Sequence, residues 1–206
     1  MTTRVTLVSP AAGEALRQVR FDDDGPLDAD GEARTRAAAG VFGADVTAFA
    51  SPSRRCGDTA RALGLERAVP TPALAGCAMG RWRGRTLDDV AATEAEGVAR
   101  WLSDPAAAPH GGESVRDLRL RVGAWLDSLR DGSPGRVVAV VEPDVVRAAV
   151  VHALGAGDAA FWRVDVRPSS ATELSGRAGR WNVVSGRPLS PRAGTSSERP
   201  PLPGTV

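Results

Sequence analysis

Several residue types are missing from this sequence. The 206-residue chain has no lysine, so all 26 of its strongly basic residues are arginine, and tyrosine and isoleucine are absent as well. Without lysine the chain cannot form a Schiff base, a lysine-containing phosphate-binding loop or an ammonium general base. The codons for the missing residues are AT-rich, so a GC-rich bacterial genome explains the composition.

Histidine and cysteine are scarce. The chain has two histidines, His110 and His152, and two cysteines, Cys56 and Cys77. Because these four residues lie far apart in the sequence, a four-ligand structural zinc site is not expected, and we predict neither a metal nor a cofactor. The two cysteines are expected to be free thiols, which is usual in a cytoplasmic protein.

Charge and hydropathy exclude further classes of protein. The net charge is +1, which provides no basic field for binding nucleic acid. No apolar stretch reaches the ~18 residues of a membrane span, and residues 1–10 resemble a strand more than a secretory signal. We therefore expect a cytoplasmic protein that binds neither nucleic acid nor membranes, and a homodimer is compatible with these features.

Short β-rich runs alternate with helical patterns bounded by glycine and proline, which favours an α/β fold. We predict a three-layer α/β/α sandwich over residues 1–186, with a mainly parallel central sheet and helices on both faces. The last 20 residues, 187–206, contain five prolines and little to bury, which predicts a disordered Pro-rich tail.

The pattern also predicts individual elements. Strands are expected at residues 4–8, 45–50, 136–141, 171–175 and 180–184, and helices at about 30–40, 54–64, 87–97, 113–129 and 143–155. Ser51 or Ser53 can cap the second helix and Thr86 the third. The run at 136–141 is apolar on both faces, which is typical of a central strand.

Five motifs occur in a recognisable order along the chain. They are SPSRRCGDTARALG (51–64), MGRWRGRTLDDV (79–90), HGGESVRDLRLRV (110–122), RVVAVVEPDVVRAAVVHALG (136–155) and FWRVDVRPSSATEL (161–174). Together they resemble the histidine phosphatase superfamily, also called the phosphoglycerate mutase-like family. The resemblance covers roughly residues 4–186, and no single motif carries it. It implies a phosphoglycerate mutase-like fold.

The resemblance also locates the family's nucleophile. Members of the family end their first strand with Arg-His-Gly, and this histidine attacks phosphorus. The matching residues are Ser9, Pro10 and Ala11; if Gly13-Glu14 is aligned with the family's Gly-Glu instead, the nucleophile position is Ala12. Neither register supplies a histidine, and proline has neither a nucleophilic side chain nor a backbone N–H.

The remaining catalytic positions differ as well. The resemblance places the family's general acid at Gly76 and its second histidine at Glu142, so that Arg55 alone matches a pocket residue. Two like charges about 4 Å apart repel by ~4 kcal/mol at an effective dielectric of 20, so Glu142 would oppose a phosphate. We predict an ion pair between Arg55 and Glu142; the alternative is that both side chains face solvent.

Other candidate residues have weaker support. His110 precedes the Gly-Gly-Glu-Ser motif, at the rim of the implied pocket, where it either contacts a ligand or belongs only to the loop. His152 is expected in the core or at a helix end. Nothing near Cys77 in the sequence would lower the pKa of its thiol. The run at 22–24 is expected to be a solvated turn and not a cation site.

These observations lead to two hypotheses about function. The first is a pseudoenzyme of this family that binds a small anionic ligand or a protein partner, with Arg55, His110 and Glu142 as candidate pocket residues. The alternative is a phosphohydrolase- or phosphomutase-family enzyme with altered chemistry, in which Glu142 is the acid or base and Arg55 orients an anionic substrate. A conventional phosphatase would need a histidine at Pro10 or, in the other register, at Ala12.

Overall fold

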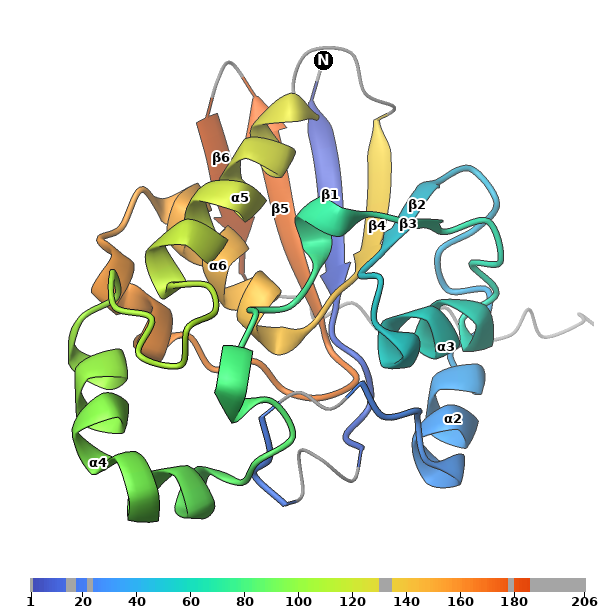
Figure 1. Cartoon of the computed structure of the whole chain (residues 1–206). Coiled ribbons are helices and arrows are strands. Elements are labelled where there is room, and N and C mark those ends of the chain that lie inside the picture. The colour runs from blue at the N-terminus through green and yellow to red at the C-terminus, as the bar shows by residue number, and fades with distance from the viewer. Residues whose placement is uncertain (1, 14–17, 22–23, 130–134, 178–179, 186–206) are drawn as a thin grey trace, which may run out of the picture.

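A six-stranded mixed sheet forms the centre of the computed structural model, which describes residues 2–13, 18–21, 24–129, 135–177 and 180–185 (Figure 1). The strands are β1 (Thr3–Val8), β2 (Thr47–Ala50), β3 (Val69–Pro70), β4 (Arg136–Val140), β5 (Ala171–Arg177) and β6 (Arg180–Val184). Their order is β3-β2-β4-β1-β5-β6; the pairs up to β1 are parallel, and β5 and β6 are antiparallel additions. The predicted tail at 187–206 lies outside the described residues.

Side-chain caps fix where most of the longer helices begin. The helices are α2 (Ala29–Arg36), α3 (Arg54–Ala62), α4 (Leu87–Ser103), α5 (Val115–Ser128) and α6 (Pro143–Leu154), with 3-10 turns η1 (Pro72–Leu74), η2 (Gly80–Trp82) and η3 (Asp158–Arg163). The hydroxyls of Ser53, Thr86 and Ser114 each accept a hydrogen bond from an N–H three residues further on. α6 ends at Gly155, whose φ of 60° is left-handed. The predicted starts of these helices are confirmed.

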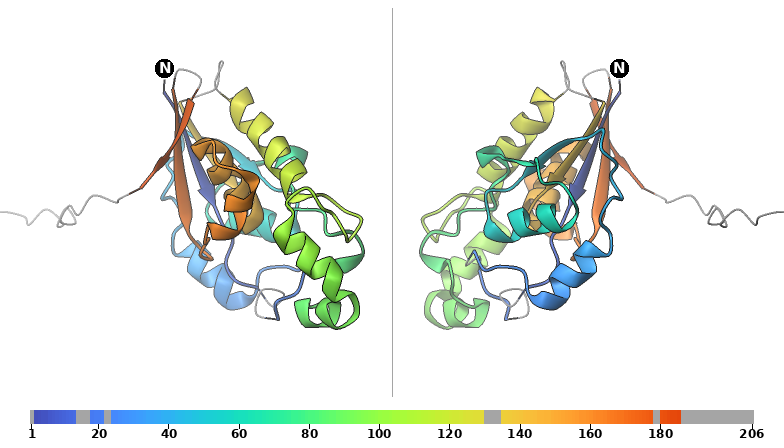
Figure 2. Two further views of the ribbon diagram at one scale, coloured as in Figure 1. Left: turned by 90° about the vertical axis from the view of Figure 1, so that its left-hand side faces the viewer. Right: turned by 90° about the vertical axis from the view of Figure 1, so that its right-hand side faces the viewer.

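Helices cover both faces of the sheet, as the sequence predicts. Val137 and Ala139 of β4 belong to the larger core cluster, which they share with the buried residues of α5 and α6 on one face (Figure 2). Val138 and Val140 point the other way and pack against Cys56 and other buried residues of α3. Because successive residues of a strand face opposite sides, this one apolar run serves both layers.

The parallel pairing of β1 and β4 determines where a site can form. Val8 is the register partner of Val140, so the two strands end side by side at one edge of the sheet. In an open α/β sheet, ligands bind outside the carboxyl ends of the strands. The segments that leave these ends, Ser9–Gly13 and Val141–Asp144, contain the positions that the family resemblance assigns to the two catalytic histidines.

Three further properties bear on function. Among the described residues, no helix is long and apolar enough to cross a membrane. In the same ranges, no group of three or more His, Cys, Asp or Glu side chains is arranged to hold a metal ion. Both Cys56 and Cys77 are free thiols, which confirms that prediction.

Candidate functional site

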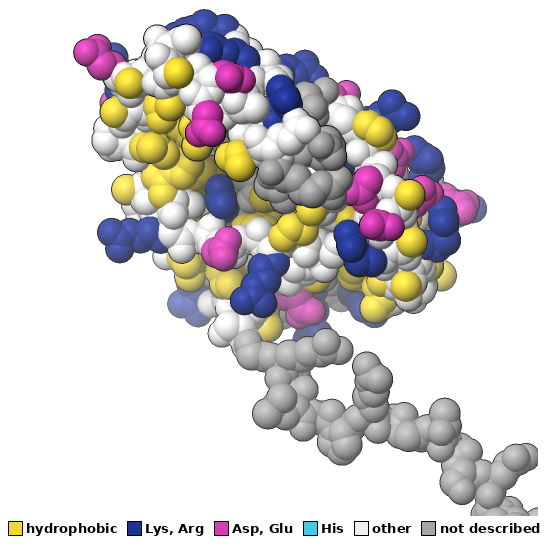
Figure 3. Space-filling model, turned by 90° about the horizontal axis from the view of Figure 1, so that it is seen from below, with side chains coloured by type: hydrophobic (Ala, Val, Ile, Leu, Met, Phe, Trp, Pro, Cys, Tyr) yellow, Lys and Arg dark blue, Asp and Glu magenta, His cyan; other side chains and the backbone are white. Residues whose placement is uncertain are grey.

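A cleft of about 270 Å³ opens at the edge of the sheet where β1 and β4 end. Its lining combines charged groups with a wall of aromatic side chains. The charged groups are Arg20, Arg55, Arg147, Glu142 and Asp144, and the aromatic side chains are Phe21, Trp101, Phe161 and Trp162. Seen from this end, the surface shows hydrophobic, arginine and carboxylate side chains but no histidine of the described residues (Figure 3).

Glu142 lies in the cleft and contacts three residues of the segment 53–56. It is the last residue before α6 and is only 7% exposed. One carboxylate oxygen accepts a hydrogen bond from the Arg55 guanidinium; the other accepts from the Ser53 hydroxyl at 2.9 Å and from the Cys56 thiol at 3.5 Å. The predicted ion pair between Arg55 and Glu142 is therefore confirmed, and both side chains are mostly buried.

Local sequence brings the members of this cluster together. Ser53 caps α3 and Arg55 lies in its first turn, whereas Glu142 is held in extended backbone immediately before Pro143, the first residue of α6. The positive end of the α6 dipole thus meets the Glu142 carboxylate and that of Asp144 in its first turn. Two carboxylates of the chain itself lie at a helix end that could otherwise bind an external anion.

The residues matched to the family's nucleophile turn away from the cleft. The Ser9 hydroxyl, almost fully buried, donates to the backbone oxygen of Arg167 at 2.6 Å and lies 3.3 Å from the Ser170 hydroxyl. Pro10 is buried and its carbonyl accepts a hydrogen bond from the Ser169 N–H. Neither Ser9 nor Pro10 lines the cleft. This turn is tied to the loop that precedes β5.

Gly76, in contrast, does line the cleft. A Cβ atom at this position would lie 3.4 Å from Glu142 Cγ and 3.5 Å from an oxygen of Asp144. An acidic side chain there would extend toward two existing carboxylates, and like charges at such distances repel by several kcal/mol in a partly buried site. The structure therefore brings together Arg55, Gly76 and Glu142 of the predicted residues.

His110 is separate from this group, contrary to its proposed place in the pocket. Its side chain is 1% exposed and does not line the cleft. Nδ1 accepts a hydrogen bond from the Gly112 N–H at 3.0 Å, and the ring packs edge-on against Trp82 with centroids 5.1 Å apart. Burial, followed by the nearby positive charge of Arg81, lowers the pKa of His110, so the imidazole is neutral at pH 7. It supports a loop.

That loop is held by a very close approach of two backbones. Gly80 has a left-handed φ of 48°, and a Cβ atom there would lie 2.2 Å from the carbonyl oxygen of His110. A Cβ atom on Gly112 would lie 1.8 Å from the carbonyl oxygen of Ala78. Only glycine fits at either position, so the Gly-x-Trp-x-Gly and Gly-Gly-Glu-Ser motifs interlock for steric reasons.

Glu94 anchors the same loop to α4. Its carboxylate accepts hydrogen bonds from the Trp82 indole at 3.1 Å and from the guanidinium groups of Arg81 and Arg85. The hydrogen bond from Arg81 is the main cause that lowers the pKa of Glu94. The residue leaves helical geometry, with φ −139° and ψ 45°, and kinks α4. Nothing in its local sequence indicates this contact.

The aromatic wall of the cleft is the second unanticipated feature. Trp101 of α4 and Trp162 of η3 meet edge to face at 4.6 Å, and Phe161 contacts Trp162 at 5.0 Å. Arg147 of α6 lies over the Phe161 ring at 5.8 Å, while its Nε donates to the Val164 carbonyl at 2.9 Å. Its guanidinium is thus positioned beside an apolar surface, which is a geometry that favours cation–π contact.

The two thiols are unsuited to nucleophilic chemistry. Burial raises the pKa of Cys77, and the negative charges of Asp144 and Glu113 raise it further. Burial and the Glu142 carboxylate likewise raise the pKa of Cys56. Because only the thiolate is an effective nucleophile, both groups are unreactive at neutral pH. The thiol of Cys77 instead donates to the Glu113 carbonyl at 3.2 Å.

Comparison with known proteins supports the resemblance seen in the sequence. The family model described as histidine phosphatase superfamily (branch 1) matches residues 11–187. The bifunctional protein Rv2228c of Mycobacterium tuberculosis is 32% identical over 172 residues, which cover 79% of this chain and 47% of that protein. The chain therefore spans about half the length of the curated relatives it matches.

Solved structures show the same fold. A mycobacterial glucosyl-3-phosphoglycerate phosphatase, Rv2419c, in complex with VO3 is 26% identical, with a TM-score of 0.78 over 88% of this chain and 97% of that one. A protein named mycobacterial hydrolase 1 is 25% identical, with a TM-score of 0.77 over 90% and 98%. A phosphoserine phosphatase from Entamoeba histolytica shares the fold at 17% identity, with a TM-score of 0.78 over 89% and 95%.

Removing either member of the Arg55–Glu142 pair should destabilise the chain. Glu142→Gln and Arg55→Gln are each expected to lower the free energy of unfolding by about 2 kcal/mol, because each removes half of a mostly buried ion pair. The double variant should lose less than the sum. Urea unfolding measures all three. Glu32→Gln, in the exposed pair with Arg36, is the control and should change stability by under about 0.5 kcal/mol. Additive losses would contradict the coupling.

The raised thiol pKa values predict alkaline destabilisation. Above about pH 8.5 the thiols ionise in the unfolded chain but stay protonated in the folded one, so stability falls by about 1.4 kcal/mol per pH unit for each thiol. The chain has no lysine or tyrosine to mask this effect. Urea unfolding from pH 7 to 9.5 should show the slope, and Cys56→Ala or Cys77→Ala should halve it. A stability that does not change above pH 8.5 would refute the prediction.

Proposed function

Because the chain belongs to the histidine phosphatase superfamily, branch 1, we propose that it is a non-catalytic member which acts by binding a ligand in the cleft. One observation carries the proposal. Glu142 occupies the position that the family resemblance assigns to the second histidine, and its carboxylate takes up Arg55, the one matching pocket residue. The group that would bind a phosphate is already neutralised by the chain itself.

The absence of a usable nucleophile among the described residues supports this proposal. The Ser9 hydroxyl is engaged by the loop before β5, and Pro10 has no reactive group. His110 is buried away from the cleft, and the pKa of the Cys77 thiol is raised. Phosphoryl transfer in this family depends on a nucleophile and on concentrated positive charge around the phosphate. The described lining of this cleft contains no such nucleophile, and its Arg55 is already paired with Glu142.

The lining of the cleft indicates the kind of ligand. Arg147 lies over the ring of Phe161 and lines the cleft together with Trp162, and it makes no ion pair with a described carboxylate. A small anionic ligand could place its charged group on Arg147 and an apolar part against the rings. The relative complexed with VO3 holds an oxyanion. For this chain we propose a small anion with an apolar body, bound without chemical change.

A second candidate function uses the same residues. Glu142 lines the cleft and could act as an acid or base on an anionic substrate oriented by Arg55, in an enzyme of the family with altered chemistry. Both carboxylate oxygens of Glu142 already accept hydrogen bonds, which disfavours this role. The two candidates differ in one property, turnover.

The first test is an assay of purified protein. With p-nitrophenyl phosphate and a panel of phosphosugars, we expect no release of phosphate above the buffer rate and no phosphohistidine at His110 or His152. Turnover that is lost in both Arg55→Ala and Glu142→Gln, but kept in the exposed control Arg100→Gln, would replace the proposed function with the altered enzyme. Turnover with phosphohistidine would refute both candidates.

The second test is a gain of binding. If Glu142 neutralises Arg55, then Glu142→Gln should raise the affinity of the cleft for inorganic phosphate by roughly tenfold or more, because a repelling charge is removed. An NMR titration followed at the amides of residues 53–56, 142, 144 and 145 measures this affinity at the cleft itself. The matched control Glu32→Gln should leave it unchanged. Equal affinity in wild type and Glu142→Gln would contradict the neutralisation.

A further inference from the structure

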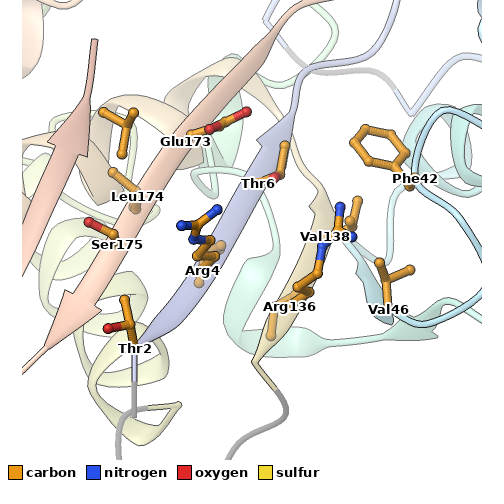
Figure 4. Close-up of a pocket in the computed structure, with 13 residues that line it drawn as sticks. Thr2, Arg4, Thr6, Phe42, Val46, Arg136, Val138, Glu173, Leu174 and Ser175 are labelled. Carbon is orange, nitrogen blue, oxygen red and sulfur yellow. The ribbon is translucent and has the colours of Figure 1, made fainter.

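A second hollow, of about 360 Å³, lies on the face of the sheet opposite α5 and α6 (Figure 4). Its floor is formed by the first halves of β1 and β4 and by β5. Phe42 and Val46 border it on one side and Val184 on the other. α3 packs on this face further along the strands, against Val8 and Val140. We call this region the sheet-face hollow.

Two arginines lie next to each other on the floor of the sheet-face hollow. Arg4 of β1 and Arg136 of β4 are register partners on parallel neighbouring strands, so their side chains leave the same face (Figure 4). Both are exposed, and neither has a carboxylate of the described residues within ion-pair distance. Like charges directly opposite each other on paired strands are destabilising. A bound counter-charge would remove the repulsion between the two guanidinium groups.

Hydroxyl groups surround the arginine pair. Ser175 of β5 is the register partner of Arg4, and Thr6 follows Arg4 on the same face of β1. The side chains of Thr2, Thr6 and Ser175 all border the hollow in Figure 4. A guanidinium presents paired N–H donors that match two oxygens of an oxyanion, and hydroxyls supply further donors. The chemistry of the floor is that of an anion site.

We propose that the sheet-face hollow binds a doubly charged oxyanion of the phosphate type between Arg4 and Arg136. The two positive charges of the pair match the charge of such a group, and the binding relieves their mutual repulsion. Glu173, opposite Thr6 on β5, is the one acidic residue in the lining. Its charge repels an anion from the β5 side and confines the ligand to the β1–β4 side. This site is separate from the cleft, because the two share no lining residue.

The test is an NMR titration of the full chain with inorganic phosphate at low ionic strength, since an exposed site is screened by salt. Binding is expected to shift the amides of residues 2–6 and 135–138 saturably. Arg136→Gln and Arg4→Gln should each weaken it roughly tenfold, the loss expected for one charge-assisted contact. Glu173→Gln should tighten it. The exposed control Arg100→Gln on α4 should bind as the wild type does.

Each other outcome overturns the proposal. Shifts that do not saturate, or that sodium chloride reproduces at equal ionic strength, would show only general screening. Shifts confined to the amides near Arg55 would place phosphate in the cleft alone. Unchanged affinity in Arg136→Gln would exclude the arginine pair. Because Arg4 and Arg136 are exposed, their replacement should not unfold the chain, and a thermal melt of each variant verifies this.

Discussion

The parallel pairing of β1 with β4 is the constraint on which the rest of this molecule depends. These strands lie 132 positions apart in sequence, as the partners Arg4 and Arg136 show, yet they form the centre of the sheet. Their parallel direction brings both outgoing segments to one edge and so creates the cleft. It also brings both incoming ends together at the other edge, where Arg4 meets Arg136. One pairing thus generates both candidate sites.

At the cleft, a single carboxylate contacts three neighbouring side chains. An imidazole at the end of β4 could carry a proton or give one up near neutral pH. Glu142 instead brings a carboxylate into contact with Arg55, Ser53 and Cys56. The strength of these contacts holds α3 and the start of α6 together. The Glu142 carboxylate thus helps to hold two helices together. A residue that bound an anion at the surface would not link them.

Much of this arrangement could be predicted from the sequence because its causes are local. The caps at Ser53, Thr86 and Ser114 and the apolar run of β4 follow from neighbouring residues, and the Arg55–Glu142 pair followed from matching ordered motifs. Contacts that depend on tertiary packing could not be predicted. His110 turns inward because Trp82 offers it a buried surface, and Glu94 kinks α4 because three donors converge on it. Nor does the sequence reveal that Arg4 and Arg136 are partners, since that requires the strand register.

The interlocked glycines at Gly80 and Gly112 have a consequence for how such chains are recognised. Each is required because two backbones pass too closely for a side chain, whatever reaction occurs nearby. Selection that preserves the shape of the loop preserves the motif, even if selection on the chemistry has ceased. The residues that identify a member of the family are therefore not the residues that determine whether it is catalytic. A search that scores the scaffold glycines will find active and inactive members equally well.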